Sequence, residues 1–431
     1  MLAIAVPIIL ANVTTPLIGL VDTAVLGQLG DPHYIGGIAI GAMIFNLLYW
    51  AFGFLRMGTT GLTAQAEGSG DNSEIGATLM RALLIAVAAG ALLILLQLPI
   101  SAISFAVLKG SQAVEASAAS YFDIRIWGAP AALANFAFLG WFIGLGRART
   151  ALVLQLLLNG TNAILDAWFV LGMGLDVAGV AYATLISQFV AAAAGIWFAF
   201  RIVKRRGIKF DMPRIVYATA IRRTLAVNGD IMIRTVCVVF AFTWFTAISA
   251  EAGDVILAAN AVLLTLTYTA AYFLDGFAFA AEALVGQAIG AKRIARFRDA
   301  VRLSTLWAII LSLVASAVFW FGGGVIIDVL TVNEDVRALA REYLVWAALV
   351  PITGVMAYQL DGIFIGATRT ADMRNMMLLS LAIFLLAWMA LTPQYGNHGL
   401  WAALVIFMSL RGLTLGVRYP ALVRAAFPEA L

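Results

Sequence analysis

Long stretches of apolar residues without a single charge dominate this sequence and restrict the folds open to it. Residues 82–98 and 303–321 form two such stretches, and each approaches the roughly 20 residues that an α-helix needs to cross a bilayer. Of the 431 residues, 63% are hydrophobic and only 12% are charged, whereas a soluble domain has about 25% charged residues. The stretches also lack the alternation typical of membrane β-strands. The sequence therefore predicts an all-α polytopic membrane protein.

Twelve transmembrane helices are expected, in two pseudo-symmetric lobes of six. The domains that follow are an N-terminal lobe over 1–200, a basic cytoplasmic linker over 201–227 and a C-terminal lobe over 228–431. The expected spans are 3–28, 35–56, 77–98, 120–145, 151–172, 177–200, 229–250, 255–280, 301–322, 340–366, 374–392 and 397–419.

Basic residues collect in alternate loops, which predicts the orientation. The linker alone holds Arg201, Lys204, Arg205, Arg206, Lys209, Arg214, Arg222 and Arg223, and the opposite loops hold little beyond Lys109, Arg125, Arg337 and Arg341. The positive-inside rule then places the linker and both termini in the cytoplasm of a bacterial-type inner membrane. Because this rule accounts for the net charge of +4, no nucleic-acid partner is expected.

The two lobes repeat each other at a constant offset of 222 residues. Phe142-Ile143-Gly144 corresponds to Phe364-Ile365-Gly366, and Arg147 corresponds to Arg369 at the same offset. The further pairs are Tyr121 with Tyr343, Leu62 with Leu284, Gln65 with Gln287, Ala66 with Ala288 and Gly68 with Gly290. An even number of spans in each half predicts a parallel repeat about an axis along the membrane normal.

Polar residues inside the first span form one stripe. Asn12, Thr15, Gly19 and Asp22 follow each other at i, i+3, i+7 and i+10, so they share one helix face. Pro16 interrupts the same helix and is a candidate hinge. An ionisable residue inside a membrane is costly and marks a functional site by default.

A second stripe lies in the fifth span, where Asn159, Asn162 and Asp166 have the spacing i, i+3 and i+7. The sixth span contributes Thr184 and Gln188. Two buried carboxyl groups close together cannot both stay ionised at low cost, which favours proton binding. The same oxygens could instead hold Na⁺. The alternative without a binding function is that these residues only cap helices or form hydrogen bonds between them.

The second lobe carries a different polar set. Tyr268, Tyr272 and Asp275 share one helix face, and Tyr358 and Asp361 share another. Tyrosines beside a carboxylate suit an organic cation, so these five residues are candidate substrate ligands; the alternative is interfacial tyrosine. Further candidates for lining a substrate cleft are Asn12, Thr15, Asn135, Asn159 and Gln188.

Other charged residues in or near the spans have simpler interpretations. We expect Arg234 and Arg411 to extend to the membrane interface. We expect Glu67, Asp71, Glu74 and Glu282 to be solvated or paired with loop arginines.

Several function classes find no support in the residues. A single cysteine, Cys237, permits no disulfide, and with only His33 and His398 the chain offers no usual zinc site. No nucleotide-binding loop is present. We therefore expect no cofactor and no enzymatic activity.

Six short segments spread over the whole chain together resemble the MATE family of multidrug and toxic compound extrusion transporters, and more closely its DinF-like branch. They are residues 16–27 (PLIGLVDTAVLG), 61–66 (GLTAQA), 162–166 (NAILD), 179–184 (GVAYAT), 274–278 (LDGFA) and 361–366 (DGIFIG).

This resemblance implies a secondary active multidrug exporter that works by alternating access. It would exchange cationic or amphipathic organic compounds for H⁺ or Na⁺, and it would act as a monomer in the lipid bilayer. The resemblance assigns coupling to Asp22, and a cation site to Asn162, Asp166 and Thr184 beside it. A seventh-helix glutamate of another branch has no counterpart here, although Asp361 matches its tenth-helix aspartate. A lipid-linked precursor flippase of the same superfamily is the alternative.

Overall fold

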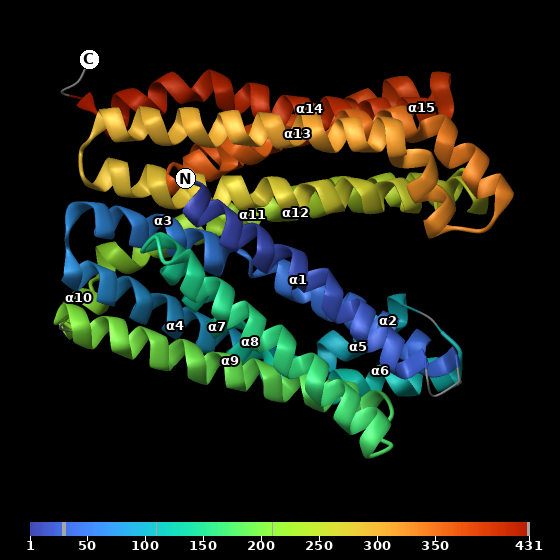
Figure 1. The fold of residues 1–431 in the computed structure, drawn as a ribbon, viewed down its shortest axis with the longest axis horizontal. Coiled ribbons are helices and arrows are strands. Elements are labelled where there is room, and N and C mark those ends of the chain that lie inside the picture. The colour runs from blue at the N-terminus through green and yellow to red at the C-terminus, as the bar shows by residue number, and fades with distance from the viewer. Residues whose placement is uncertain (28–31, 109, 209, 429–431) are drawn as a thin grey trace. The chain divides into compact units, whose positions relative to one another are not determined.

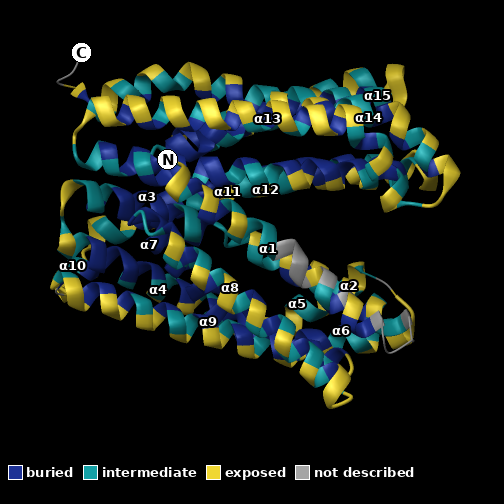
Figure 2. Ribbon diagram, viewed as in Figure 1, coloured by how far each residue is buried: buried dark blue, intermediate teal, exposed yellow. Residues whose placement is uncertain are grey.

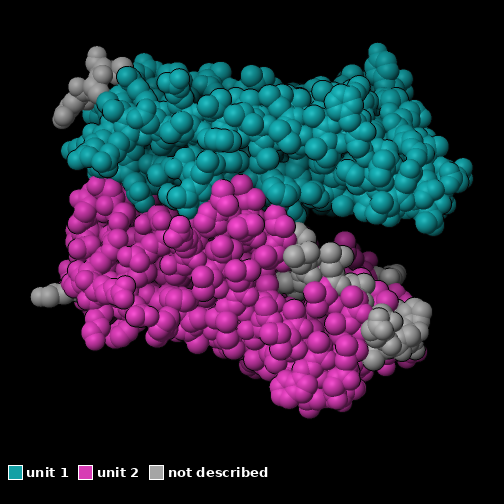
Figure 3. Space-filling model, in the orientation of Figure 1, with its two compact units in different colours: residues 1–5, 229–431 teal, residues 6–228 magenta. Residues whose placement is uncertain are grey.

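The computed structural model of the chain describes residues 1–27, 32–108, 110–208 and 210–428, and all of their side chains except those of residues 15–18, 20, 23, 27 and 32. It divides into two compact units, coloured separately in Figure 3. We call residues 6–228 the N-terminal unit, and residues 1–5 with 229–431 the C-terminal unit. In the described ranges both units consist of helices and the turns between them.

The N-terminal unit contains the first ten α-helices except residues 2–5 of α1 (Figure 1), with a 3-10 turn before α7 and a π-helical segment after α8. They are α1 (Leu2–Gly27), α2 (Pro32–Ala51), α3 (Phe54–Ser69), α4 (Asn72–Leu95), α5 (Gln97–Val107), α6 (Gln112–Arg125), η1 (Ile126–Gly128), α7 (Ala129–Gly144), α8 (Ala148–Asp166), η2 (Ala167–Gly172), α9 (Val177–Arg206) and α10 (Met212–Ile215).

The C-terminal unit is built from longer helices. One of them, α11, belongs to the N-terminal unit up to Asn228 and to the C-terminal unit from Gly229 onward. The set is α11 (Ala218–Glu251), α12 (Asp254–Gly290), α13 (Ile294–Leu330), α14 (Glu334–Gly366) and α15 (Thr370–Ala426).

The expected all-α polytopic fold is confirmed. In the described chain, ten helices are long and apolar enough to cross a membrane. One of them, α15, holds two of the expected spans on either side of Gly396, whose φ of 55° and ψ of −132° break the helix. The first expected span falls on α1. The expected span 120–145 falls on α6, η1 and α7, which together form one apolar helical stretch over Gln112–Gly144 with a short 3-10 turn at η1.

The outer faces of the helices are apolar, as a lipid environment requires. Phe321, Val417 and Leu95 are 86%, 79% and 78% exposed, and Figure 2 shows such exposed positions recurring along α13. A soluble protein rarely exposes extended apolar surfaces of this kind. The buried side of each helix is therefore the side that faces its own unit.

The internal repeat reappears in the packing of α7 on α3 and of α14 on α12. A Cβ atom at Gly140 would clash with the carbonyl oxygen of Arg56, and one at Gly362 would clash with that of Ala278. Both the glycines and their partners are 222 residues apart. Small residues let helix backbones approach closely in membranes, so the two units use the same glycine contact.

A second pair of glycines continues each contact one turn later. A Cβ at Gly144 would lie 2.7 Å from the carbonyl oxygen of Thr60, and one at Gly366 would lie 2.5 Å from that of Glu282. These partners again differ by 222 positions. The repeat is therefore present in the structure as well as in the sequence: α7 packs on α3 in the same register as α14 packs on α12.

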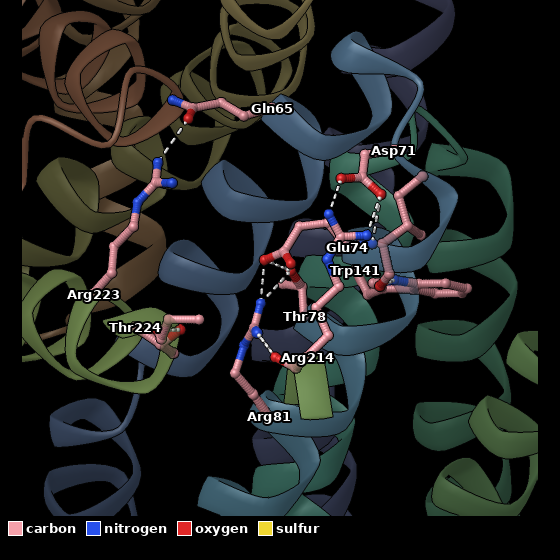
Figure 4. Close-up of polar contacts among 11 residues, drawn as sticks. Gln65, Asp71, Glu74, Thr78, Arg81, Trp141, Arg214, Arg223 and Thr224 are labelled. Carbon is pink, nitrogen blue, oxygen red and sulfur yellow. Dashed lines mark hydrogen bonds and ion pairs between the residues drawn. The ribbon is translucent and has the colours of Figure 1, made fainter. Parts of the chain in front are cut away.

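Ion pairs tie the helix ends of the N-terminal unit together (Figure 4). Asp71 caps α4 through the amide of Glu74 at 3.0 Å, and Arg214 of α10 donates two hydrogen bonds to Asp71, at 3.1 and 2.8 Å. Arg81 pairs with Glu74 and donates to the carbonyl oxygen of Arg214 at 3.1 Å. The short helix α10 is therefore held against the start of α4.

These contacts test the expectation that the four acidic residues near the span ends are solvated or paired with arginines. Pairing with arginines is confirmed for Asp71 and Glu74, and for Glu67, which Arg206 contacts at 2.5 and 2.9 Å. Glu282 is buried within α12, so the solvated alternative is wrong for this residue and its pairing with an arginine stays a prediction.

We expect Gly144→Ala to destabilise the protein. The added methyl group would meet backbone rather than a movable side chain, and overpacking of this kind costs about 1–3 kcal/mol. The melting temperature of the purified protein in detergent should fall. Gly160→Ala in α8 is the matched control, since nothing lies within 4 Å of its Cβ position. Equal melting temperatures for the two variants would contradict the packing role of Gly144.

Candidate functional site

Two buried carboxyl groups meet inside the N-terminal unit. Asp22 of α1 is 5% exposed and Asp166 at the end of α8 is 0% exposed. Their carboxyl groups lie within hydrogen-bonding reach of each other. Among the described residues, Oδ1 of Asp22 and both oxygens of Asp166 have no hydrogen-bond donor. An unpaired buried charge is costly in a membrane protein, so a carboxyl pair of this kind is a candidate site for a proton or another cation.

The local structure of α8 aims its polar residues at this point. Asn159, Asn162 and Asp166 are all buried, which agrees with their expected common face. Directly after Asp166 the helix changes to the π-helical segment η2. Such segments are rare and frequently occur at functional sites.

Amide and hydroxyl groups connect α8 to its neighbours. Asn162 donates from Nδ2 to Oγ1 of Thr184 on α9 at 3.4 Å, and Asn159 donates to Oγ1 of Thr14 on α1 at 2.7 Å. Oδ1 of Asn162 is buried without a donor. The four expected coupling residues, Asp22, Asn162, Asp166 and Thr184, are therefore grouped within one unit.

The structure brings together one further expected pair. Asn135 of α7 donates from Nδ2 to the backbone and side-chain oxygens of Gln188 on α9, at 3.0 and 2.9 Å. Asn12 lies half-buried on α1. The side chains of Thr15 and Pro16 lie outside the described residues.

Sequence reasoning missed two residues of this region. Thr14, which neighbours the chosen Thr15, is the hydroxyl partner of Asn159. Arg125 was counted among the loop charges but is the last residue of α6, where its Nη1 donates to the hydroxyl of Tyr121 at 2.5 Å.

The surroundings of Arg125 connect it to the acids. Its guanidinium group lies over the ring of Phe45, 4.6 Å from the centroid, and its charge acts on both Asp22 and Asp166. An arginine inside the expected span 120–145 was the signal that could have identified it.

The donor set of the site is oxygen-rich. In the ranges that the structure describes, no group of three or more His, Cys, Asp or Glu side chains could hold a metal ion. Carboxyl, amide and hydroxyl oxygens of the four expected coupling residues suit a proton, or a hard monovalent cation such as Na⁺.

The C-terminal unit also has a buried carboxylate, but this one is paired with arginines. Asp361 of α14 accepts hydrogen bonds through Oδ2 from Arg234 of α11 and, at 2.9 Å, from Arg411 of α15. The arginine side chains are 12% and 2% exposed. The expectation that Arg234 and Arg411 extend to the membrane interface is wrong, because the shared carboxylate holds both of them inside the unit.

The other expected substrate ligands of this unit lie near the ion pair or on its surface. The ring of Tyr358 lies 5.6 Å from the guanidinium carbon of Arg411, and Asp275 acts electrostatically on Arg234. Tyr268 and Tyr272 are partly exposed on α12. Substrate binding by these residues and by Asp361 stays a prediction, in which an organic cation would have to compete with two arginines.

We expect Asp361→Asn to destabilise the folded protein by about 3–5 kcal/mol, because it leaves two buried guanidinium groups without their shared partner. Asp328→Asn is the control: Asp328 also accepts from two arginines but is 39% exposed, and surface pairs contribute about 0–1 kcal/mol. Chemical unfolding of both variants in detergent measures the difference. Similar losses for the two variants would contradict the structural role of the buried pair.

The comparisons with known proteins agree with this architecture. Residues 7–168 and 231–389 match the model of the MatE family, one match in each unit. The chain is 43% identical over 412 residues to DNA damage-inducible protein F of Escherichia coli (strain K12), which covers 96% of this chain and 90% of that protein. It is 23% identical over 428 residues to the probable multidrug resistance protein NorM of Acinetobacter baylyi, at 96% and 93% coverage.

Solved structures show the same fold. The crystal structure of the Vibrio cholerae MATE transporter VcmN in the bent form matches with a TM-score of 0.87 and 18% identity, over 98% of this chain and 96% of that one. A structure titled as the outward-facing conformation of a multidrug resistance MATE family transporter matches with a TM-score of 0.86 and 19% identity, at 98% and 95% coverage.

Two repeated helical units with membrane-spanning helices, one of which encloses a pair of carboxyl groups, define a multi-pass membrane transporter. The chain belongs to the MatE family of multidrug efflux transporters. The members of this family are transporters and not enzymes.

Proposed function

We propose that this transporter exports cationic or amphipathic organic compounds in exchange for protons by alternating access. The observation that carries the proposal is the pair formed by Asp22 and Asp166, buried and within hydrogen-bonding reach, with three of its oxygens lacking a donor. A proton shared between the two acids would satisfy both geometry and charge.

Coupling between proton and substrate would arise because the carboxyl pair of Asp22 and Asp166 binds different partners with and without its proton. With a proton bound, the acids need no further cation. Without it they carry excess negative charge in a low-dielectric interior, which favours a cationic compound or a rearrangement of α1. An ion can shift a conformational equilibrium only by its differential affinity for the two states. We propose that bending of α1 at Pro16 provides this difference.

Asn162 and Thr184 would orient the pair. Asn162 donates to Thr184, which leaves the buried Oδ1 of the asparagine to accept from a protonated acid. The same oxygens are the ligands that a sodium ion would use, so Na⁺ is the alternative coupling ion. Asn12, Thr15, Asn135, Asn159 and Gln188 are proposed to line the substrate path beside it.

The flippase alternative needs a cationic groove for a pyrophosphate group. The two arginines inside the C-terminal unit do not supply it freely, because Asp361 holds both of them. The matched relatives named as multidrug resistance proteins also favour export of small organic compounds.

We expect Asp22→Asn to abolish proton-driven export of ethidium. The amide cannot bind and release a proton, so the exchange loses its coupling step. Ethidium export is measured in inverted membrane vesicles under an imposed pH gradient, without and with a sodium gradient. Asp123→Asn, which changes an exposed residue of α6, serves as the control and should export like the unmodified protein.

Three outcomes separate the alternatives in that experiment. Export that depends on the pH gradient alone and is lost in Asp22→Asn supports proton coupling. Export that requires the sodium gradient assigns the same residues to Na⁺. If Asp22→Asn exports as well as the unmodified protein under either gradient, the coupling role of Asp22 is wrong.

We also propose that both termini and the loop that contains α10 face the cytoplasm of the inner membrane, because basic residues concentrate there. In a Cys237→Ala background, a membrane-impermeant maleimide added to intact spheroplasts should label Val332→Cys and leave Asp211→Cys unlabelled. Both positions are exposed, so accessibility alone does not separate them. The reverse labelling pattern would overturn the orientation.

A further inference from the structure

A small basic cavity lies in the N-terminal unit, where the turn before α8 meets the end of α9. Its volume is about 180 Å³. Arginines provide most of its polar lining, and two apolar side chains of α9 provide the rest. The lining residues are Arg147, Thr150, Phe198, Arg201, Ile202 and Arg205.

The three arginines of this cavity differ from their basic neighbours. Nearby Arg206 and Arg214 are each bound to a carboxylate, Glu67 and Asp71. Within the described parts of the chain, no carboxylate forms an ion pair with Arg147, Arg201 or Arg205. Three guanidinium groups around one cavity attract an anion, and their planar donor pairs match phosphate oxygens well.

The internal repeat supplies a comparison for this site. At the offset of 222, Arg147 corresponds to Arg369 and Thr150 corresponds to Asp372. In the C-terminal unit, Asp372 pairs with Arg369 at 2.9 Å and with Arg418 at 2.7 Å. Where one unit has a built-in anion, the other has a threonine and an open cavity.

The surroundings of the cavity indicate that the anion carries acyl chains. Just before Arg201 on α9, Ile196, Trp197 and Phe200 are 60%, 51% and 62% exposed. The ring of Trp197 lies 4.7 Å from the guanidinium carbon of Arg201. Exposed aromatic residues next to arginines at a helix end are typical of the membrane interface, and basic pockets at the cytoplasmic side bind anionic head groups.

We propose that Arg147, Arg201 and Arg205 form a binding site for the phosphodiester head group of an anionic phospholipid, with Thr150 as a hydroxyl donor. The acyl chains would lie along the exposed apolar face of α9. The bound lipid supplies to the N-terminal unit the negative charge that Asp372 supplies to the C-terminal unit. We assign the phosphate group to a phospholipid, rather than to free phosphate, because an exposed apolar face lies beside the cavity.

The decisive variant introduces into the N-terminal unit, at Thr150, the carboxylate that the C-terminal unit has at Asp372. Thr150→Asp should pair with Arg147, as Asp372 pairs with Arg369, and so displace the lipid. Thr150→Asn has nearly the same shape without the charge and is the matched control. Native mass spectrometry of the full-length protein measures binding of added phosphatidylglycerol, phosphatidylcholine and, separately, inorganic phosphate.

For the unmodified protein and Thr150→Asn we expect phosphatidylglycerol to bind more tightly than phosphatidylcholine. In Thr150→Asp its affinity should fall by about tenfold or more, as expected for neutralising one to two cationic contacts. Equal binding in the two Thr150 variants would overturn the proposal. Binding of inorganic phosphate as tight as that of phosphatidylglycerol would overturn the assignment to a lipid.

A second pair of variants keeps the test valid if Thr150→Asp does not fold. Arg201→Gln/Arg205→Gln removes two charges from the cavity, and Arg149→Gln/Arg222→Gln removes two exposed charges outside it. Only the first pair should lose phosphatidylglycerol. Equal losses in both pairs would mean non-specific attraction by net charge and would contradict the site. Because binding is measured without transport, the result does not depend on the proposed antiport.

Discussion

Helices in lipid gain little from the hydrophobic effect when they associate, because the hydrocarbon is as apolar as their own side chains. Close backbone approach must replace it. In this transporter α7 approaches α3 through Gly140 and Gly144, and α14 approaches α12 through the corresponding glycines. These contacts fix the register of the central helices in each unit, and the polar side chains are positioned relative to that register.

The two units treat a buried carboxylate in opposite ways. In the C-terminal unit Asp361 forms ion pairs with two arginines of the same chain. In the N-terminal unit, the described groups that act on Asp22 and Asp166 are the two acids themselves and the charge of Arg125. A site of the first kind is suited to holding a structure together, whereas the second kind is the one for which we propose an exchangeable cation. A similar contrast holds for arginines. In the C-terminal unit Asp372 pairs with Arg369, whereas in the N-terminal unit the corresponding residue, Thr150, carries no charge.

Much of this could be predicted from the sequence, because hydrophobic length and helical spacing act locally. The spans, the repeat and the common face of Asn159, Asn162 and Asp166 all follow from residue order. What could not be predicted depends on contacts between helices. Nothing in the local sequence distinguishes Arg411 bound to Asp361, 50 residues away, from an arginine that reaches the interface.

The choice between Thr14 and Thr15 shows the same limit. Both lie on α1, and their spacing to Asp22 differs by one residue. Only the position of Asn159 on the neighbouring helix decides that Thr14 is its partner. Likewise, Glu282 lies near the end of an expected span in the sequence, yet it is buried in a part of α12 that α14 approaches closely at Gly366.

The π-helical segment η2 has a consequence for how this gene can change. A π-helical turn holds one residue more than an α-helical turn, so η2 places one extra residue between Asp166 and the turn that begins at Met173. Losing one residue from Ala167–Gly172 would restore regular helix without moving Asp166. It would also change the direction in which the chain leaves η2 towards α9. Substitutions in this segment should therefore be tolerated better in evolution than single-residue deletions, although a deletion would make the helix more regular.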